Sequence, residues 1–149
     1  MGTHYRGQAR EVRALDALIK LVRCTNSLSA RLEARLREDG FTGNQFGLLE
    51  ALFHLGPLEP CELGPKLLTS RTNVVLLLDQ LEGSDLVRRT PVERDRRRVL
   101  VKLTPEGRRV IEKVFTRHVA RLVEELSVLS AAEQEELARL CKRLGTKSG

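Results

Sequence analysis

The strongest constraint on the fold is a change of hydrophobic period within the stretch Leu67–Gly107. In its first half, apolar residues recur at helical spacing, which places them on one face of a helix. Ser70 precedes this run and can accept hydrogen bonds from the free N–H groups of the first turn, so we expect the helix to begin just after it. Gly83–Asp85 is predicted to end it. The apolar face comprises Val74, Leu77, Leu78 and Leu81.

The second half of the stretch changes to two short β-rich runs. The first, Leu86–Thr90, is followed by Pro91, where we expect the run to break, and the second is Val99–Leu103. Two such runs around a charged loop predict a β-hairpin. A helix followed at once by a hairpin with an arginine-rich tip is typical of a winged helix-turn-helix, a fold that grips DNA. The expected tip comprises Arg94, Asp95, Arg96, Arg97 and Arg98.

The charge of the chain supports a polyanion site in this hairpin. The 24 residues from Leu86 to Arg109 hold nine Lys or Arg and three Asp or Glu, an excess of six that equals the net charge of the whole chain, +6. The other 125 of the 149 residues therefore sum to about zero. A basic excess concentrated in one segment indicates a nucleic-acid partner. The alternative is a charged loop that is merely solvated.

Composition excludes several other classes of function. The chain is 41% hydrophobic and 31% charged, and we expect one soluble domain, 1–149. Tyr5 and four phenylalanines are too few for the stacking platforms that bind single-stranded nucleic acid. We expect no membrane partner and no secretion signal, because long apolar runs and an apolar leader are lacking. Cys24, Cys61 and Cys141 are odd in number and widely spaced, which indicates a reducing cytoplasm.

Helix starts outside the central stretch carry capping patterns. Thr42–Gln45 and Ser130–Glu133 both match the capping box, in which a hydroxyl and a Gln or Glu side chain satisfy each other's backbone N–H groups. Phe41 and Phe46 flank the first of these as a hydrophobic staple. Thr104, followed by a proline, predicts the start of a helix directly after the hairpin.

A short third helix is predicted from Pro60 through Leu68. Pro60 can open it, because a proline in the first turn loses no helical hydrogen bond. Pro65 lies later, where it lacks a needed N–H and clashes with the preceding turn. We therefore expect this helix to be short, kinked or to begin late.

Apolar stripes at both ends of the chain predict a protein partner. They exceed what one DNA-binding lobe of about residues 42–104 can cover. We expect residues 10–38 and 105–145 to pack as dimerisation helices against a second copy, and burial within one larger core is the alternative. The predicted dimerisation residues are Leu15, Ile19, Leu122, Leu126, Leu137 and Leu140.

Several motifs together resemble the MarR family of winged helix-turn-helix bacterial transcription regulators. They are Ser70–Thr72 at the start of the central helix, Leu81-Glu82 followed by Asp85–Arg88, and above all Asp95–Arg97 running into Leu103–Gly107. The last is an Asp-x-Arg wing followed at fixed distance by Leu-Thr-x-x-Gly. The resemblance covers nearly the whole chain from about residue 10.

The resemblance implies a mainly α protein with a small β-hairpin wing and interleaved N- and C-terminal dimerisation helices. It implies a homodimer that binds a pseudo-palindromic double-stranded DNA operator as a sequence-specific regulator, with repression as the expected sign. A ligand or an oxidant acting between the dimerisation helices and the DNA lobes would release the DNA. The expected contacts from the recognition helix are Ser70, Arg71, Thr72, Asn73, Val75 and Leu76.

Different roles are expected within the wing. Arg97 is predicted to enter a narrow, A·T-rich minor groove, which attracts guanidinium groups. Asp95 is expected to hold the Arg97 side chain by a charge-assisted hydrogen bond. Arg94, Arg96 and Arg98 are then the cations that face phosphates.

The chain departs from the family pattern in the middle of the recognition helix. Many relatives have a Ser or Thr and an Arg there, where this chain has Val75 and Leu76. Leu76 points away from the apolar stripe and could contact thymine methyl groups in the major groove. The alternative is a tolerated surface leucine. Pro65 is a second departure.

No pattern for catalysis, a cofactor or a metal is present. His4, His54 and His118 are isolated, so a zinc site is not expected, and phosphate loops or nucleophile motifs are lacking. We therefore expect a protein that is not an enzyme, responding to a small organic anion or a phenol-like effector. One alternative is a nucleoid-type or protein-interaction module without operator specificity. Another is thiol-based redox sensing through Cys24, although a buried structural cysteine is the commoner case.

Overall fold

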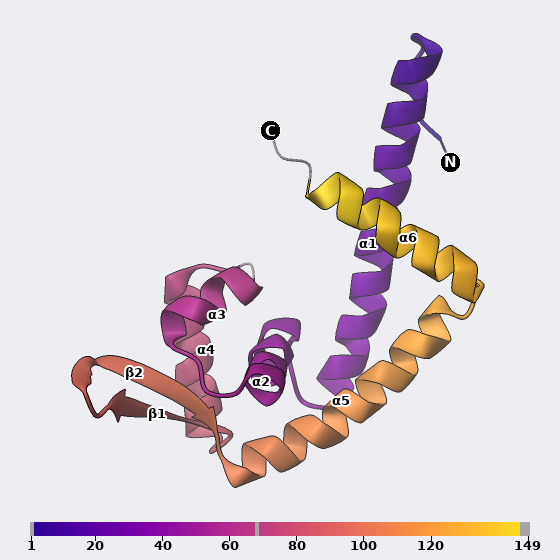
Figure 1. Cartoon of the computed structure of the whole chain (residues 1–149). Coiled ribbons are helices and arrows are strands. Elements are labelled where there is room, and N and C mark those ends of the chain that lie inside the picture. The colour runs from indigo at the N-terminus through magenta and orange to yellow at the C-terminus, as the bar shows by residue number, and fades with distance from the viewer. Residues whose placement is uncertain (1, 68, 147–149) are drawn as a thin grey trace.

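The computed structural model describes residues 2–67 and 69–146. It confirms a mainly helical fold with a two-stranded antiparallel wing (Figure 1). Helices α2, α3 and α4 and the hairpin group into a lobe, and α1 and α6 extend away from it. The elements are α1 (Ala9–Glu38), α2 (Gly43–Leu55), α3 (Pro60–Leu67), α4 (Arg71–Gly83), β1 (Val87–Val92), β2 (Asp95–Leu103), α5 (Pro105–Leu126) and α6 (Ala131–Gly145).

The predicted helix starts are confirmed by their cap geometry. The Thr42 hydroxyl accepts from the Gln45 N–H at 3.2 Å, and the Gln45 side chain accepts from the Thr42 N–H at 3.0 Å. The same reciprocal arrangement opens α6 at Ser130. Ser70 accepts from the N–H of Asn73 at 3.2 Å and thereby opens α4. These hydroxyls satisfy donors that the first turn of a helix would otherwise leave unpaired.

The short third helix is also confirmed, with two qualifications. Helix α3 begins at Pro60, so it does not begin late, and Pro65 lies inside it. The helix ends at Leu67, two residues after the proline that removes one of its hydrogen bonds. Leu68, which we expected the helix to reach, lies outside the described residues.

The wing differs from the predicted hairpin in the length of its strands. Pro91 does not break β1 but lies within it opposite Val99, with a register irregularity between Pro91 and Val92. β1 is an edge strand, where a proline is tolerated, whereas β2 also forms a bridge to Leu58 through Val101. The turn is confined to Glu93 and Arg94. The expected charged loop was therefore too long, since Asp95–Arg98 belongs to β2.

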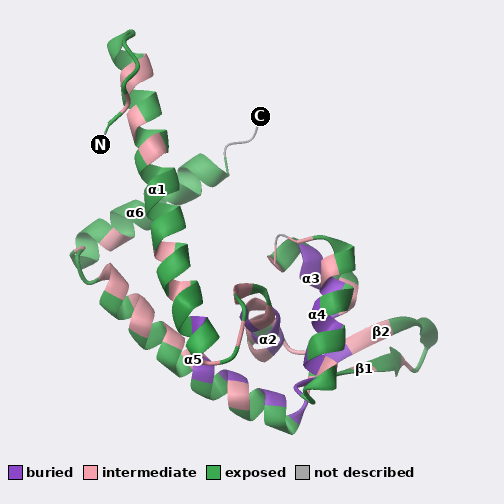
Figure 2. Cartoon of the chain, turned by 180° about the vertical axis from the view of Figure 1, so that it is seen from behind, coloured by how far each residue is buried: buried purple, intermediate pink, exposed green. Residues whose placement is uncertain are grey.

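The hydrophobic core lies in the lobe and where α1 and α5 meet it (Figure 2). In α1 the only described buried residue is Leu36, and none of the described residues of α6 is buried. The terminal apolar stripes therefore stay exposed or half-buried in the single chain, and they do not join one larger core as the alternative required. No helix among the described residues is long and apolar enough to cross a membrane.

Helix α1 is joined to α5 by a buried carboxylate. The side chain of Asp39 is 6% exposed, forms an ion pair with Arg117 at 2.8 Å and accepts a hydrogen bond from Arg121 at 2.6 Å. Arg121 also donates to the carbonyl oxygen of Arg35 in the last turn of α1. Next to this cluster, the His118 ring packs against Phe46 of α2, with ring centroids 4.6 Å apart and the planes tilted by 46°. Burial lowers the pKa of His118, which favours the neutral ring in this contact.

The recognition helix, both strands of the wing and α5 meet at one junction. The Thr104 hydroxyl donates to the carbonyl oxygen of Asp85 at 2.6 Å and accepts from the N–H of Gly107 at 2.9 Å. The N–H of Thr104 donates to the carbonyl oxygen of Leu86 at 3.1 Å. A Cβ on Gly107 would overlap that same oxygen and lie 2.8 Å from the Leu86 carbonyl carbon. Position 107 therefore accepts no side chain.

We predict that Gly107→Ala lowers the free energy of unfolding by more than about 3 kcal/mol, because the backbones of two elements must separate to admit a methyl group. Gly83→Ala is the matched control, since nothing lies within 4 Å of a Cβ built there. It should stabilise the protein by up to about 1 kcal/mol, as alanine replaces glycine at a helical position. Urea unfolding followed by circular dichroism at one protein concentration measures both. Equal midpoints for the two variants would contradict the junction.

Candidate nucleic-acid interface

Helix α4 presents one face to the core and the opposite face to solvent. Val74, Leu77, Leu78 and Leu81 are buried, as predicted. Among the expected DNA contacts, the structure exposes Arg71, Thr72, Val75 and Leu76 together with Ser70, whose hydroxyl caps the helix. Asn73 is only partly exposed, and its amide nitrogen donates to the Thr69 hydroxyl at 2.7 Å.

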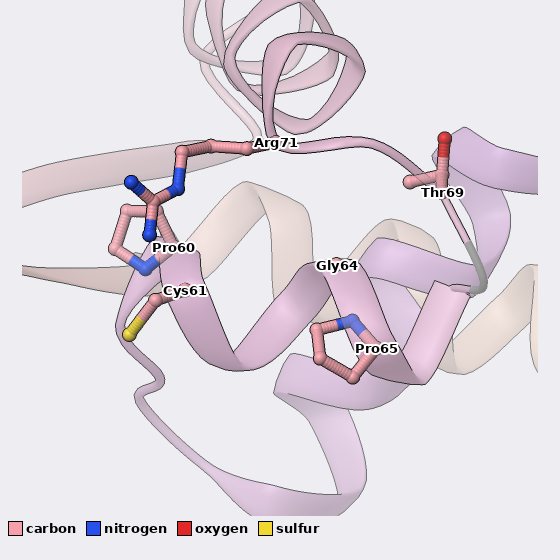
Figure 3. A pocket seen from close by; sticks show the side chains of 6 residues that line it. All are labelled: Pro60, Cys61, Gly64, Pro65, Thr69 and Arg71. Carbon is pink, nitrogen blue, oxygen red and sulfur yellow. The ribbon is translucent and has the colours of Figure 1, made fainter.

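Arginine 71 lies at the N-terminal end of this exposed face. Its side chain extends over Pro60 and Cys61 of α3 and borders a hollow of about 310 Å³ (Figure 3). The hollow continues along α3 to Gly64 and Pro65. A cation at the start of the recognition helix, beside an open surface, is suited to a phosphate group.

The acidic residues of α4 are neutralised by the wing. Arg89 of β1 donates through Nη2 to Asp79 at 2.7 Å and through Nε to Glu82 at 3.0 Å. Its backbone N–H also donates to Glu82, at 3.1 Å. Hydrogen bonds to Asp79, and then to Glu82, raise the pKa of Arg89. Asp79 and Glu82 lie at i and i+3, so both carboxylates are on one face of α4. This spacing could have indicated that a cation of the same chain neutralises them. Arg89 was instead counted with the basic residues available to a partner.

Arg98 connects the wing to α3. Its Nε donates to Glu59, the residue before α3, at 2.8 Å, and the same carboxylate raises its pKa. The sequence assigned Arg98 to a phosphate, whereas the structure pairs it with this carboxylate. The reason is tertiary, because the fold brings β2 next to Glu59, which lies 39 positions from Arg98 in sequence.

The Asp95 side chain accepts from the backbone N–H of Arg97 at 3.1 Å. The expected bond to the Arg97 guanidinium is not among the hydrogen bonds of the described residues, and the carboxylate orients the backbone of β2 instead. This local bond is of the kind Asp makes to an N–H two residues on.

The cations left available on the wing are Arg94, Arg96 and Arg97 near its tip and Lys102 nearer its base. All four are exposed, and within residues 2–67 and 69–146 none of them takes part in an ion pair. Arg71, a further exposed cation, opens α4 itself, and strand β1 of the wing packs against that helix. This arrangement can neutralise phosphates on either side of a groove that holds α4.

The three cysteines Cys24, Cys61 and Cys141 are free and exposed. Cys24 is therefore not the buried structural cysteine that we considered the commoner case, since its side chain is exposed on α1 in the single chain. The described residues contain no cluster of three or more His, Cys, Asp or Glu side chains that could hold a metal ion.

Comparison with known proteins agrees with this geometry. The model of the MarR family matches residues 41–99. YkoM of Bacillus subtilis, described as an uncharacterised HTH-type transcriptional regulator, is 31% identical over 136 residues, covering 91% of this chain and 88% of YkoM. The HTH-type transcriptional regulator MhqR of the same organism is 29% identical over 133 residues, covering 89% of this chain and 92% of MhqR. The structure of AbsC, a MarR family transcriptional regulator from Streptomyces coelicolor, superposes with a TM-score of 0.82 at 24% identity, covering 95% of this chain and 96% of AbsC.

We predict that Arg89→Ala weakens binding to double-stranded DNA by about 1 kcal/mol per lobe, because it leaves Asp79 and Glu82 uncompensated near phosphates. Arg88→Ala is the charge-matched control, since Arg88 pairs with Asp85 at 3.6 Å and is largely exposed. Fluorescence anisotropy with one duplex at one salt concentration compares the two.

Neutralising both acids should rescue the defect. In the Arg89→Ala background, Asp79→Asn combined with Glu82→Gln is expected to restore affinity to the level of Arg88→Ala. Equal affinity of the two single variants would show that Arg89 does not act by shielding these carboxylates.

Proposed function

The chain belongs to the MarR family of transcriptional regulators, and on this premise we propose that it is a homodimeric repressor that binds a pseudo-palindromic operator in double-stranded DNA. Its relatives are transcriptional regulators, so the chain is a regulator and not an enzyme. We further propose that it works in the cytoplasm and that a small organic effector releases the DNA.

The observation that carries the proposal is the exposed face of α4 with unpaired cations beside it. A helix of this kind fits the major groove, where base edges are read, while flanking arginines contact phosphates or the minor groove. Arg71 at one end of α4 and Arg96 and Arg97 on the wing supply these cations. Sequence specificity then requires that α4 contact base edges directly, since phosphate contacts alone carry no sequence information.

The uncovered terminal helices support the homodimer. A hollow of about 430 Å³ lies between α1 and α6, and its walls are almost wholly apolar. Leu15, Leu137 and Leu140 are exposed in the single chain, and Ile19, Leu122 and Leu126 are half-buried. Contiguous apolar surface of this kind marks an interface, and a second copy would cover it. The residues lining the hollow are Ala14, Ala17, Leu18, Leu21, Leu137, Leu140, Cys141 and Leu144.

The proposal that the effector is a small organic molecule is based on ligands of proteins with the same fold. NadR is solved in complex with 4-hydroxyphenylacetate, and the DNA binding of BpsR from Bordetella bronchiseptica is regulated by 6-hydroxynicotinic acid. At 24% and 21% identity these proteins share the fold alone with this chain. A hollow of about 250 Å³ between α1 and α5 is lined by two arginines and two glutamates, Arg35, Arg121, Glu124 and Glu125, together with Leu32 and Val128. Because its charges balance and Arg121 is bound to Asp39, the hollow itself does not select an anion.

We predict that the protein selects specific duplexes from genomic DNA and binds them with a steep salt dependence. If the dimer neutralises about eight phosphates, log K should fall against log[salt] with a slope of about −7. Arg96→Ala should weaken all duplexes alike and reduce the slope by about one per lost contact. Arg97→Ala should cost about 1–3 kcal/mol per half-site and reduce the preference for A·T-rich flanks. Asp95→Ala should also weaken binding, because the backbone of Arg97 loses its support.

Other outcomes would point elsewhere. Equal affinity for the selected and random duplexes at one salt concentration would favour a nucleoid-type module. Tighter binding by Asp95→Ala would contradict the orienting role of that carboxylate. Release of DNA by peroxide from the wild type, but not from Cys24→Ser, would establish thiol sensing in place of a small organic effector.

We predict that Leu140→Glu converts the dimer to monomers, because a carboxylate on α6 would be buried against the partner without a cation. Leu122→Glu should act in the same way. Leu55→Glu is the control, since Leu55 is 58% exposed at the end of α2 and lies outside the terminal helices. Sedimentation at micromolar concentration measures the mass, and a wild-type monomer would end the dimer proposal.

A further inference from the structure

The recognition helix carries an apolar outer face. Val75 and Leu76 are 45% and 53% exposed, although both lie in the interior of a 13-residue helix. Leu76 follows Thr72 by one turn, so their side chains lie one above the other on the face opposite the buried stripe. The centre of the surface that would enter the major groove is therefore formed by methyl groups.

Two amide side chains and one carboxylate beside this face already bind other groups of the protein, which leaves the Thr72 hydroxyl and Arg71 as the exposed polar groups of the first turn. The Asn73 amide donates to the Thr69 hydroxyl at 2.7 Å, and the Gln80 amide oxygen accepts from Gln45 at 3.1 Å. Asparagine and glutamine are the residues that pair with adenine edges, and both amides are held elsewhere in this fold. Asp79, an acceptor of the kind that reads cytosine, is tied to Arg89 at 2.7 Å.

We propose that Leu76 and Val75 recognise the operator through the 5-methyl groups of thymine. This inference rests on the proposed DNA-binding function and names the chemical feature that α4 reads. Thymine is the base that presents a methyl group in the major groove, and packing it on a leucine removes apolar surface of both from water. The edges of guanine, adenine and cytosine present donors or acceptors, which a leucine would desolvate without pairing. The half-site under α4 is therefore thymine-bearing.

The position of the two residues separates them from ordinary surface leucines. A single exposed leucine, such as Leu55, needs no explanation. Leu76 and Val75 instead lie on α4, which begins at Arg71 and packs against strand β1 of the wing that carries the free arginines. Cations that hold phosphates would therefore also bring this apolar face against base edges. The positive charge around α4 thus indicates that DNA, rather than a protein, covers the exposed apolar face formed by Val75 and Leu76.

Replacement of thymine by deoxyuridine tests the proposal. Deoxyuridine keeps the base-pairing groups of thymine and removes its methyl group alone. In the duplex that the protein selects from a random library, each thymine is replaced in turn and affinity is measured by anisotropy. Wild-type protein should lose about fourfold for each contacted methyl group, and about 15-fold when the same position is changed in both half-sites.

Three variants assign the effect to residues. Leu76→Ala should weaken binding to the thymine duplex and become indifferent to deoxyuridine at one position of the half-site. Val75→Ala should do the same at a neighbouring position. Leu55→Ala, an equal truncation outside α4 and the wing, should keep the full deoxyuridine sensitivity of the wild type. Because both residues on α4 are exposed, their truncation leaves the core intact, and unchanged thermal unfolding checks this.

The outcomes separate this inference from the function on which it rests. A sequence-specific complex that is indifferent to deoxyuridine at every position would overturn thymine recognition and leave the regulator intact. Deoxyuridine sensitivity that persists undiminished in both Leu76→Ala and Val75→Ala would also overturn it. Failure to prefer any duplex would overturn the proposed function together with the inference.

Discussion

The close contact of Gly107 with the Leu86 carbonyl is the constraint on which the arrangement of the lobe depends. It lets α5 begin directly against the loop that ends α4, and the Thr104 hydroxyl joins the same two segments through Asp85 and Gly107. The recognition helix, the wing and the helix that leads to the terminal region therefore share one rigid origin. Because each element starts or ends at this point, a displacement of one must move the others. The motifs around Leu86 and Gly107 that carry the family resemblance are the residues of this contact.

Internal ion pairs decide which charges of the basic segment remain available. Arg89 neutralises two carboxylates of α4, and Arg98 is held by Glu59. The wing is thereby tied to α4 and to the start of α3, and among the described residues its cations without an ion pair are Arg94, Arg96, Arg97 and Lys102. A net charge of +6 describes the chain, but the surface that meets a polyanion is set by the arginines without an internal partner.

The lobe and the terminal helices differ in how much apolar surface they bury within the chain. The lobe has a closed core, whereas most of α1 and all the described residues of α6 bury nothing within the chain (Figure 2). Helix α5 belongs to both parts, because Ile111 and Val114 complete the core and Arg117 and Arg121 hold Asp39 at the end of α1. A partner that fixes the terminal helices would therefore also orient the lobe, through a buried carboxylate rather than through a flexible linker.

The sequence by itself determined the elements whose signals are local. Hydroxyl caps, the apolar period of α4 and the glycine ends of helices involve residues within one or two turns, so their outcome could be predicted from spacing alone. The same local patterns predicted the change from helix to hairpin, and the resemblance to the MarR family was recognised from that change. Only the tertiary structure decided the continuation of β1 through Pro91, the pairing of Arg89 and Arg98 with carboxylates, and the engagement of Asn73 and Gln80. Most of these outcomes depend on side chains that packing brings together, such as Gln45 and Gln80, which are 35 positions apart. The sequence of one segment does not indicate which distant side chain will contact it. The sequence therefore predicted which residues could contact DNA, and the fold determined which of them are free to do so.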